Sequence, residues 1–129
     1  MAKLLAVDDQ KVMRELISGI LQGEGHEVVL AEDGVEALEI ARELAVDMVL
    51  TDINMPNMNG ISLVSKLRRL ESYENIPIIM LTTESSDFKK DKAKRMGADG
   101  WLQKPFDPTR LIKAVNTCLA KSGHVLPAR

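Results

Sequence analysis

Short apolar runs alternate with longer amphipathic stretches along this chain. The runs, each four or five residues long, lie at Lys3–Val7, Glu27–Ala31, Met48–Thr51, Pro77–Leu81 and Gly100–Gln103. Each run is too short for a buried helix, so each predicts a strand. Strands that alternate with helical patterns are typical of an α/β fold around a parallel sheet. No obvious repeat or low-complexity linker interrupts the alternation, which favours one domain.

Four of the stretches between the runs carry apolar residues at helical spacing. The first helix is expected over about Lys11–Gln22 and ends at Gly23-Glu24-Gly25, while the second begins at Asp33–Glu36, which has capping-box spacing. The third follows Gly60 and the fifth begins at about Pro108. The apolar positions predicted to face the core are, in the first helix, Val12, Met13, Leu16, Ile17, Ile20 and Leu21, and in the second, Val35, Leu38, Ala41 and Leu44. In the third they are Ile61, Val64 and Leu67, and in the fifth Leu111, Ile112, Val115 and Leu119.

The fourth helix, between Phe88 and Met96, has a different pattern. Ala93 is its one other apolar position, among four lysines and one arginine. So little apolar surface predicts weak anchoring and a less stable element. Its basic side is either a solvated face or a movable face that binds a partner.

Composition narrows the class of protein. The 129 residues are 45% hydrophobic, enough for one folded domain over residues 1–121, with a short tail at 122–129. A net charge of -2 gives no general attraction to nucleic acid or to an anionic membrane. The single cysteine, Cys118, fits a reducing compartment. No secretory leader and no apolar run near the ~18 residues of a membrane span is visible, so we expect a cytoplasmic protein.

Polar residues stand where four of the predicted strands end. Asp8 and Asp9 follow the first, Asp52 the third, Thr82 the fourth and Lys104 the fifth. The carboxyl ends of parallel strands form the ligand crevice of an open α/β sheet, so these side chains should converge at one edge. Three carboxylates, a hydroxyl and an ammonium can together hold a divalent cation and a phosphoryl group.

Each of these residues has a chemical role and a plainer alternative. Asp8 and Asp9 diverge, so one can bind Mg2+ directly and the other through water, unless one of them only caps a turn. Asp52 can form an acyl phosphate or be a turn residue. Lys104 offers a mobile point charge for a phosphoryl oxygen or is a surface lysine. Thr82 can donate its hydroxyl to that oxygen or be an ordinary strand residue.

Several of these segments together resemble bacterial two-component receiver domains. They are Val7-Asp8-Asp9, Asp52-Ile53-Asn54-Met55-Pro56-Asn57-Met58-Asn59-Gly60, Thr82 and Lys104-Pro105-Phe106, and the resemblance spans about Lys3 to Leu119. It is greatest to the stand-alone chemotaxis regulators, because no output domain follows. The resemblance implies a doubly wound, flavodoxin-like sheet of five parallel strands in the order 2-1-3-4-5, with about five helices.

The resemblance also implies a role for each site residue. Asp9, Asp52 and the backbone carbonyl of Asn54 would ligate Mg2+, with Asp8 assisting through water. Thr82 and Trp101 would form the switch, although the indole is larger than the usual Tyr or Phe, so Trp101 either rotates or stays fixed. Asn54 and Glu84 would flank the hydrolytic water and tune the phosphoryl lifetime. The Lys–Pro bond after the fifth strand is typically cis in this family.

The implied function is signalling. A histidine kinase would phosphorylate Asp52 with Mg2+, and the domain would catalyse only its own phosphorylation and dephosphorylation. The fourth helix, fifth strand and fifth helix would then bind an output protein such as a flagellar motor switch component. We expect a monomer, with a phosphatase as a further partner of the family. A phosphate sink, a relay intermediate, or a regulator of type IV pili or of a kinase are open alternatives.

Three rival interpretations conflict with the sequence. A phosphatase of the haloacid dehalogenase type carries Asp-x-Asp after its first strand, whereas Asp8 and Asp9 are adjacent and Asp52 follows the third. A flavin-binding flavodoxin needs a Ser/Thr/Gly-rich phosphate loop after the first strand, where this chain has two carboxylates. A pseudo-receiver would lack the acceptor or a metal ligand, and this chain retains them all.

Overall fold

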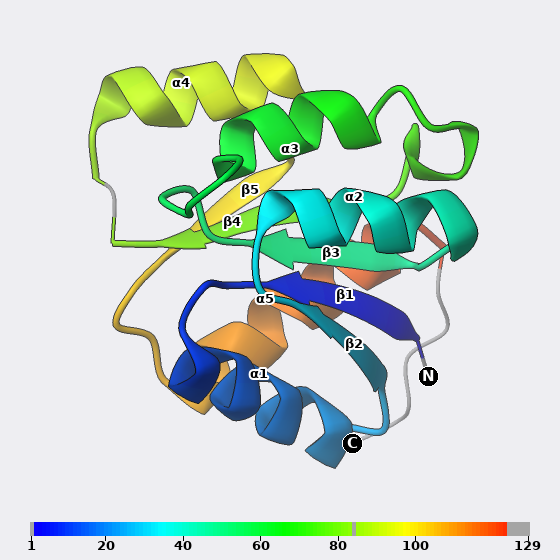
Figure 1. The fold of residues 1–129 in the computed structure, drawn as a ribbon. Coiled ribbons are helices and arrows are strands. Elements are labelled where there is room, and N and C mark those ends of the chain that lie inside the picture. Colours follow the sequence, from blue (N-terminus) through cyan, green and yellow to red (C-terminus); the bar gives the residue numbers. More distant parts are fainter. Residues whose placement is uncertain (1, 84, 124–129) are drawn as a thin grey trace.

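A five-stranded parallel sheet forms the centre of the molecule, with strand order β2-β1-β3-β4-β5 (Figure 1). The computed structural model describes residues 2–83 and 85–123, so Glu84 and most of the predicted tail lie outside the described residues. The strands are β1 (Lys3–Val7), β2 (Glu27–Ala31), β3 (Met48–Thr51), β4 (Ile78–Thr82) and β5 (Gly100–Gln103). The predicted α/β class and strand order are therefore confirmed.

Five α-helices cover the two faces of the sheet (Figure 1). One face packs against α1 (Lys11–Gly23) and α5 (Pro108–Lys121), and the other against α2 (Gly34–Glu43), α3 (Gly60–Leu67) and α4 (Asp87–Met96). One short 3-10 helix, η1 (Glu71–Tyr73), was not predicted. No helix among the described residues is both long enough and apolar enough to cross a membrane.

Alternation along each strand divides the interior into two cores. Leu4 and Ala6 of β1 contribute to the core under α1 and α5, whereas Leu5 and Val7 contribute to the core under α2 and α3. Successive strand residues point to opposite faces, and both faces of this sheet are covered. The strands therefore appear in the sequence as continuous apolar runs.

The second helix begins with a modified capping box. The Asp33 carboxylate accepts a hydrogen bond from Glu36 N–H at 2.8 Å, as the spacing predicts. In return, Glu36 Oε1 accepts from Glu32 N–H, one residue before the N-cap. The pKa of Asp33 is lowered chiefly by the Glu36 N–H and then by the Asn57 side-chain amide.

The predicted buried faces of α1 and α2 are too wide. Val12 is 80% exposed, Leu16 46% and Val35 40%, so their assignment to the core is wrong. A helix lying on a sheet buries only the positions directed at the strands, here Ile17 and Leu21 of α1. Helical spacing identifies the side of the helix that faces inward but not the width of the buried strip.

The weak anchoring of α4 is confirmed. Ala93 is the buried residue of this helix, while Phe88 is 70% exposed and Met96 38% exposed. Little apolar surface is removed from water when this helix packs, so local opening is expected to require less free energy here than in α3, whose five buried residues include Leu63 and Val64.

Candidate functional site

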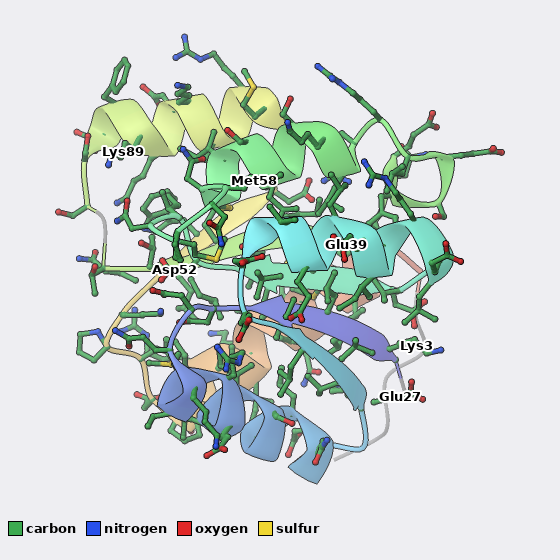
Figure 2. All side chains as sticks on the ribbon, viewed as in Figure 1. Lys3, Glu27, Glu39, Asp52, Met58 and Lys89 are labelled. Atoms are coloured by element: carbon green, nitrogen blue, oxygen red, sulfur yellow. The ribbon has the colours of Figure 1, made fainter. Side chains whose placement is uncertain are left out.

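Three carboxylates lie together at the carboxyl edge of β1 and β3. The side chains of Asp8, Asp9 and Asp52 each offer an oxygen, and these atoms lie within 4.8 Å of one another. Asp8 directly follows β1 and Asp52 directly follows β3, its neighbour in the sheet. The N–H of Asp52 donates to the carbonyl of Val7 at 3.0 Å, which fixes the two strand ends (Figure 2 labels Asp52 at this edge).

The carboxylates differ in burial and in their partners. Asp8 is buried, and its two oxygens accept hydrogen bonds from Gln10 N–H at 2.9 Å and Lys104 Nζ at 2.5 Å. Asp52 is 9% exposed, and one of its oxygens accepts from Ile53 N–H at 2.7 Å. Asp9 is exposed, and its carboxylate has no hydrogen bond or ion pair among the residues that the structure describes.

Lys104 brings a positive charge into this cluster from the end of β5. Its Nζ lies 2.5 Å from Asp8 Oδ2 and 3.3 Å from Asp52 Oδ2, and its side chain is only 8% exposed. A buried ammonium requires such pairing, because desolvation of an unpaired charge is costly. The Lys104-Pro105 bond is cis, as the resemblance implies.

The loop that carries Asp52 is held by a close approach of backbone to backbone. A Cβ on Gly60 would lie 1.9 Å from the carbonyl oxygen of Asp52, so no other residue fits there without movement. The N–H of Gly60 donates to the Ile53 carbonyl at 2.8 Å, and Asn59 caps α3 through Ser62 N–H at 2.9 Å. Asp52 is therefore positioned from both ends of its loop.

The other predicted site residues lie around this cluster at different depths. Thr82 is buried at the end of β4, and its carbonyl accepts from Lys104 N–H at 2.9 Å. Asn54 is exposed and lines a groove between α3 and α4. Glu84 lies outside the described residues, so its predicted role stays a prediction.

Trp101 is half-buried and packs against the core on the α2–α4 side of the sheet. Lys90 Nζ of α4 lies 5.4 Å from the centre of its ring, within cation–π range. Its indole Nε1 is buried without a hydrogen-bond partner among the described residues. Whether Trp101 rotates or stays fixed remains a prediction.

One further residue, Arg14, supports the site and was not predicted from the sequence. Arg14 of α1 donates from Nη1 to the Asp8 carbonyl at 2.7 Å and so fixes the turn between β1 and α1. An arginine on an amphipathic helix has no local pattern that distinguishes this contact from solvent exposure. The lone Cys118 adds no chemistry, because burial raises its thiol pKa and thus disfavours the reactive thiolate.

The donor set fits a magnesium ion. Three carboxylates against one ammonium leave two unbalanced negative charges at this edge, which matches a divalent cation. All the donors are oxygens, and Mg2+ is usually bound by one or two carboxylates with several retained waters. Within residues 2–83 and 85–123, both oxygens of Asp9 are without a partner, whereas both oxygens of Asp8 are already engaged.

Comparison with known proteins identifies the family. The model for the "response regulator receiver domain" matches residues 4–116. A chemotaxis protein CheY homologue from Campylobacter jejuni is 44% identical over 119 residues, which cover 91% of this chain and 92% of the relative. Other relatives are longer, and the chain spans 54% and 52% of two of them.

Solved structures agree with this match. Chemotaxis protein CheY4 of Vibrio cholerae is 46% identical with a TM-score of 0.89, over 92% of this chain and 98% of that one. The receiver domain of the Pseudomonas aeruginosa sensor histidine kinase PA1611 is 27% identical with a TM-score of 0.85, over 92% and 98%, and holds a magnesium ion in its active-site cleft. The sheet order, the acidic edge and these matches together place the chain in the response regulator receiver domain family.

Proposed function

We propose that this domain accepts a phosphoryl group on Asp52, in a magnesium-dependent reaction, from the phosphohistidine of a histidine kinase. The observation that carries the proposal is the contact of Lys104 Nζ with both Asp8 and Asp52 inside a cluster of three carboxylates. One buried ammonium beside a carboxylate nucleophile supports the binding of a phosphoryl group, and the acidic excess supports the binding of a metal.

Magnesium would be held by Asp9, Asp52 and the backbone carbonyl of Asn54, with Asp8 acting through water. The carboxylate of Asp9, which has no partner among the described residues, and the engaged oxygens of Asp8 support this division. A bound Mg2+ would offset the repulsion between the anionic nucleophile and the anionic donor. The magnesium in the related PA1611 receiver is consistent with this assignment.

The phosphoryl transfer itself uses residues of this chain. An oxygen of Asp52 attacks phosphorus, the P–N bond of the donor breaks, and its electron pair returns to the imidazole, which takes a proton from water. Lys104 binds a phosphoryl oxygen and the Thr82 hydroxyl donates to another. Hydrolysis would later break the acyl phosphate bond, and Asn54 and Glu84 are the residues that we propose tune its rate.

The output would be delivered by protein contact at the face of α4, β5 and α5. Two grooves of about 240 and 400 Å3 flank Trp101, one against α4 and the other against α5. The first is lined by charges of both signs, Lys90 and Lys94 with Asp91 and Asp99. The second is lined by the basic residues Arg110 and Lys113. When Thr82 engages the phosphoryl group, the following loop would move and alter this face, with Trp101 as the aromatic of the switch.

The biological setting that we propose is chemotaxis or motility, in line with the CheY relatives. The output partner would then be a component such as the flagellar motor switch, and a phosphatase would end the signal. A phosphate sink or a relay intermediate would use the same site without this output face. We propose that the receiver domain spans residues 1–121, is followed by a short tail, and is monomeric. We propose a cytoplasmic location, since the free thiol of Cys118 fits a reducing compartment.

Acceptance of the phosphoryl group is tested with acetyl phosphate as donor and intact-protein mass as the readout. We expect the mass of one phosphoryl group on the wild type with Mg2+ and none with EDTA. Asp52→Asn should remain unmodified, while Asp91→Asn, which removes an exposed carboxylate of α4, should behave as the wild type. Equal labelling of Asp52→Asn would place the acceptor elsewhere and refute the proposal.

The metal assignment is tested by Mg2+ titration, followed through the emission of Trp101, the single tryptophan. Asp9→Ala should lose most of its affinity, about tenfold or more, because it removes a direct carboxylate ligand. Lys104→Ala should bind Mg2+ at least as well as the wild type, because a nearby ammonium repels a cation. Undiminished binding by Asp9→Ala would remove Asp9 from the proposed ligands.

A further inference from the structure

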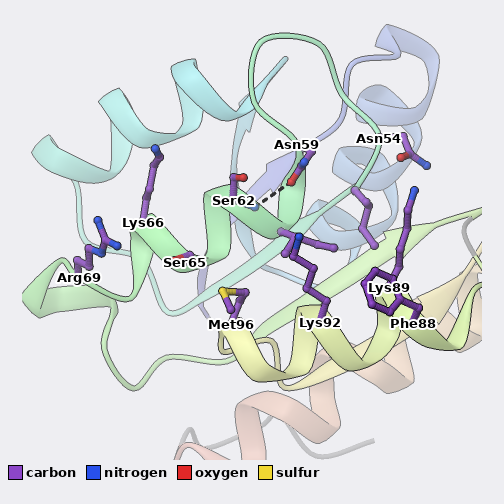
Figure 3. A pocket seen from close by; sticks show the side chains of 12 residues that line it. Asn54, Asn59, Ser62, Ser65, Lys66, Arg69, Phe88, Lys89, Lys92 and Met96 are labelled. Atoms are coloured by element: carbon purple, nitrogen blue, oxygen red, sulfur yellow. Dashed lines mark hydrogen bonds between the residues drawn. The ribbon is translucent and has the colours of Figure 1, made fainter.

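A second groove, separate from the face around Trp101, lies between α3 and α4 (Figure 3). It encloses about 300 Å3 and is bounded at one end by Ile53 and Asn54 of the loop after β3. Its cationic lining residues are Lys66 of α3, Arg69 two residues after the end of α3, and Lys89 and Lys92 of α4. None of the described residues that line it is Asp or Glu, although the whole chain has a net charge of -2.

Three of these four cations have no oppositely charged partner in the described part of the fold. Among residues 2–83 and 85–123, Lys66, Arg69 and Lys92 take part in no ion pair. All three side chains are exposed. Their charges therefore add to one another along the groove, and an anionic occupant would meet no competing carboxylate among the lining residues described.

The groove also has an apolar component. Buried Ile53 and Ile61 line it, and Met96 lies opposite Ser65 (Figure 3). Phe88, at 70% exposed, lines the end near Lys89 and offers apolar surface to a ligand there. A ligand that carried charge alone would leave these side chains in water.

The positions of the charges indicate the shape of the ligand. In Figure 3, Arg69 and Lys66 lie toward one end of the groove, Lys92 lies along its middle, and Lys89 lies toward Asn54 at the other end. A single phosphate or carboxylate requires donors that converge on one point. Charges spread along a groove fit carboxylates spread along a chain.

The groove is fixed by contacts within the fold. Arg68, next to Arg69, donates from Nε and Nη2 to the Gly97 carbonyl at 3.1 and 2.7 Å, which joins the end of α3 to the end of α4. Gly97 has a φ of 118° and approaches the Arg68 side chain closely. A ligand would therefore meet an existing groove at this end and would not have to order it.

We infer that the α3–α4 groove binds an acidic segment of a partner protein, with carboxylates that pair with Lys66, Arg69 and Lys92, and with apolar side chains that pack on Phe88 at one place along the groove and on Met96 at another. Complementary charge steers such a segment and sets its register, and the apolar contact excludes water from it. This site goes beyond the proposed output at α4, β5 and α5, because it uses the opposite side of α4 and does not require phosphorylation.

The test uses a fluorescent helical peptide of alternating Glu and Leu pairs, about 12 residues or roughly 18 Å long. Binding is measured by anisotropy, and amide chemical shifts locate the site. Peptides with Gln for Glu, or with Ser for Leu, separate the contributions of charge and apolar contact. A single-stranded oligonucleotide of matched charge serves as the competing class of ligand.

The matched variants reverse two charges on opposite sides of the same helix. Lys66→Glu/Lys92→Glu changes the groove, whereas Lys90→Glu/Lys94→Glu changes the side of α4 that faces Trp101. The groove variant should weaken peptide binding about tenfold at low salt, and the control less than about twofold. Shifts should concentrate on α3 and on the groove side of α4, and both changed peptides should bind more weakly.

Four results would overturn the inference. The first is a larger loss of peptide affinity in Lys90→Glu/Lys94→Glu than in Lys66→Glu/Lys92→Glu, and the second is equal affinity for the original peptide and the peptide with Ser in place of Leu. The third is tighter binding of the oligonucleotide than of the peptide through the same residues, and the fourth is no peptide binding by the folded wild type. Far-ultraviolet circular dichroism and thermal unfolding of both double variants establish that each remains folded. All four changed residues are exposed or half-buried, so a folded control pair is expected.

Discussion

Replacement of Gly60 by Ala should weaken both the fold and the site, because the added methyl group has no space. Its Cβ would lie 1.9 Å from the Asp52 carbonyl oxygen and 2.9 Å from the carbonyl carbon, well inside van der Waals contact. Both atoms belong to the backbone, so the strain cannot be relieved by a side-chain rotation. The loop that carries Asp52 must move by more than about 1 Å to restore a normal contact.

The magnitude follows from two opposing effects. Overpacking in a tight interior typically costs about 1–3 kcal/mol, and the bond from Gly60 N–H to Ile53 O, 2.8 Å long, would be strained as well. Ala is favoured over Gly in a helix by up to about 1 kcal/mol, which offsets part of the cost. We therefore expect the free energy of unfolding to fall by about 1–3 kcal/mol.

Gly19 provides the matched control, since a Cβ there would meet no atom within 4 Å and the residue is exposed on α1. Gly19→Ala should raise the free energy of unfolding by about 0.5–1 kcal/mol. Urea unfolding followed by circular dichroism measures both variants, and Mg2+ titration of Gly60→Ala measures the effect on the site. A Gly60→Ala protein as stable as the wild type, with unchanged metal affinity, would refute the reasoning.

Two further predictions concern stability away from the site. The phenol of Tyr73 is fully buried and donates to the Leu44 carbonyl, and burial raises its pKa from 10.0 to about 12. The free energy of unfolding therefore includes a full contribution from the protonated phenol below pH 10, and this contribution is lost as the pH rises toward 12, because only the unfolded state releases the proton in that range. The loss should amount to about 2–3 kcal/mol and should be absent in Tyr73→Phe, as measured by urea unfolding at several pH values. Arg68 donates to three carbonyls within 3.1 Å and pairs with Asp99 at 2.9 Å. Arg68→Lys should lower the free energy of unfolding by about 2–4 kcal/mol because an ammonium cannot reach all these partners; a loss below about 0.5 kcal/mol would contradict this assignment.

The sheet and its acidic edge were predictable for a simple physical reason. Strands buried on both faces are continuous apolar runs, so β1 and β3 were predicted with their observed bounds. The site residues directly follow such runs, so parallel topology was enough to bring Asp8 and Asp52 together. The contact of Lys104 with Asp8, 96 residues away in sequence, follows from the same topology.

Other features have no local signal in the sequence. The donation from Arg68 to the Gly97 carbonyl spans 29 residues and depends on how α3 and α4 pack. The exposure of Val12 and Leu16 depends on the angle at which α1 lies on the sheet, which periodicity does not give. The groove between α3 and α4 likewise becomes visible only once the two helices are placed.

The most direct measurement of the central claim is the location of the phosphoryl group. After reaction with acetyl phosphate and Mg2+, borohydride reduces an aspartyl phosphate to homoserine, which marks the acceptor in peptide mass spectra. We expect homoserine at Asp52 in the wild type, and none when EDTA replaces Mg2+ or in Asp52→Asn. Homoserine at Asp8 or Asp9, or labelling of Asp52 that is independent of Mg2+, would contradict the account.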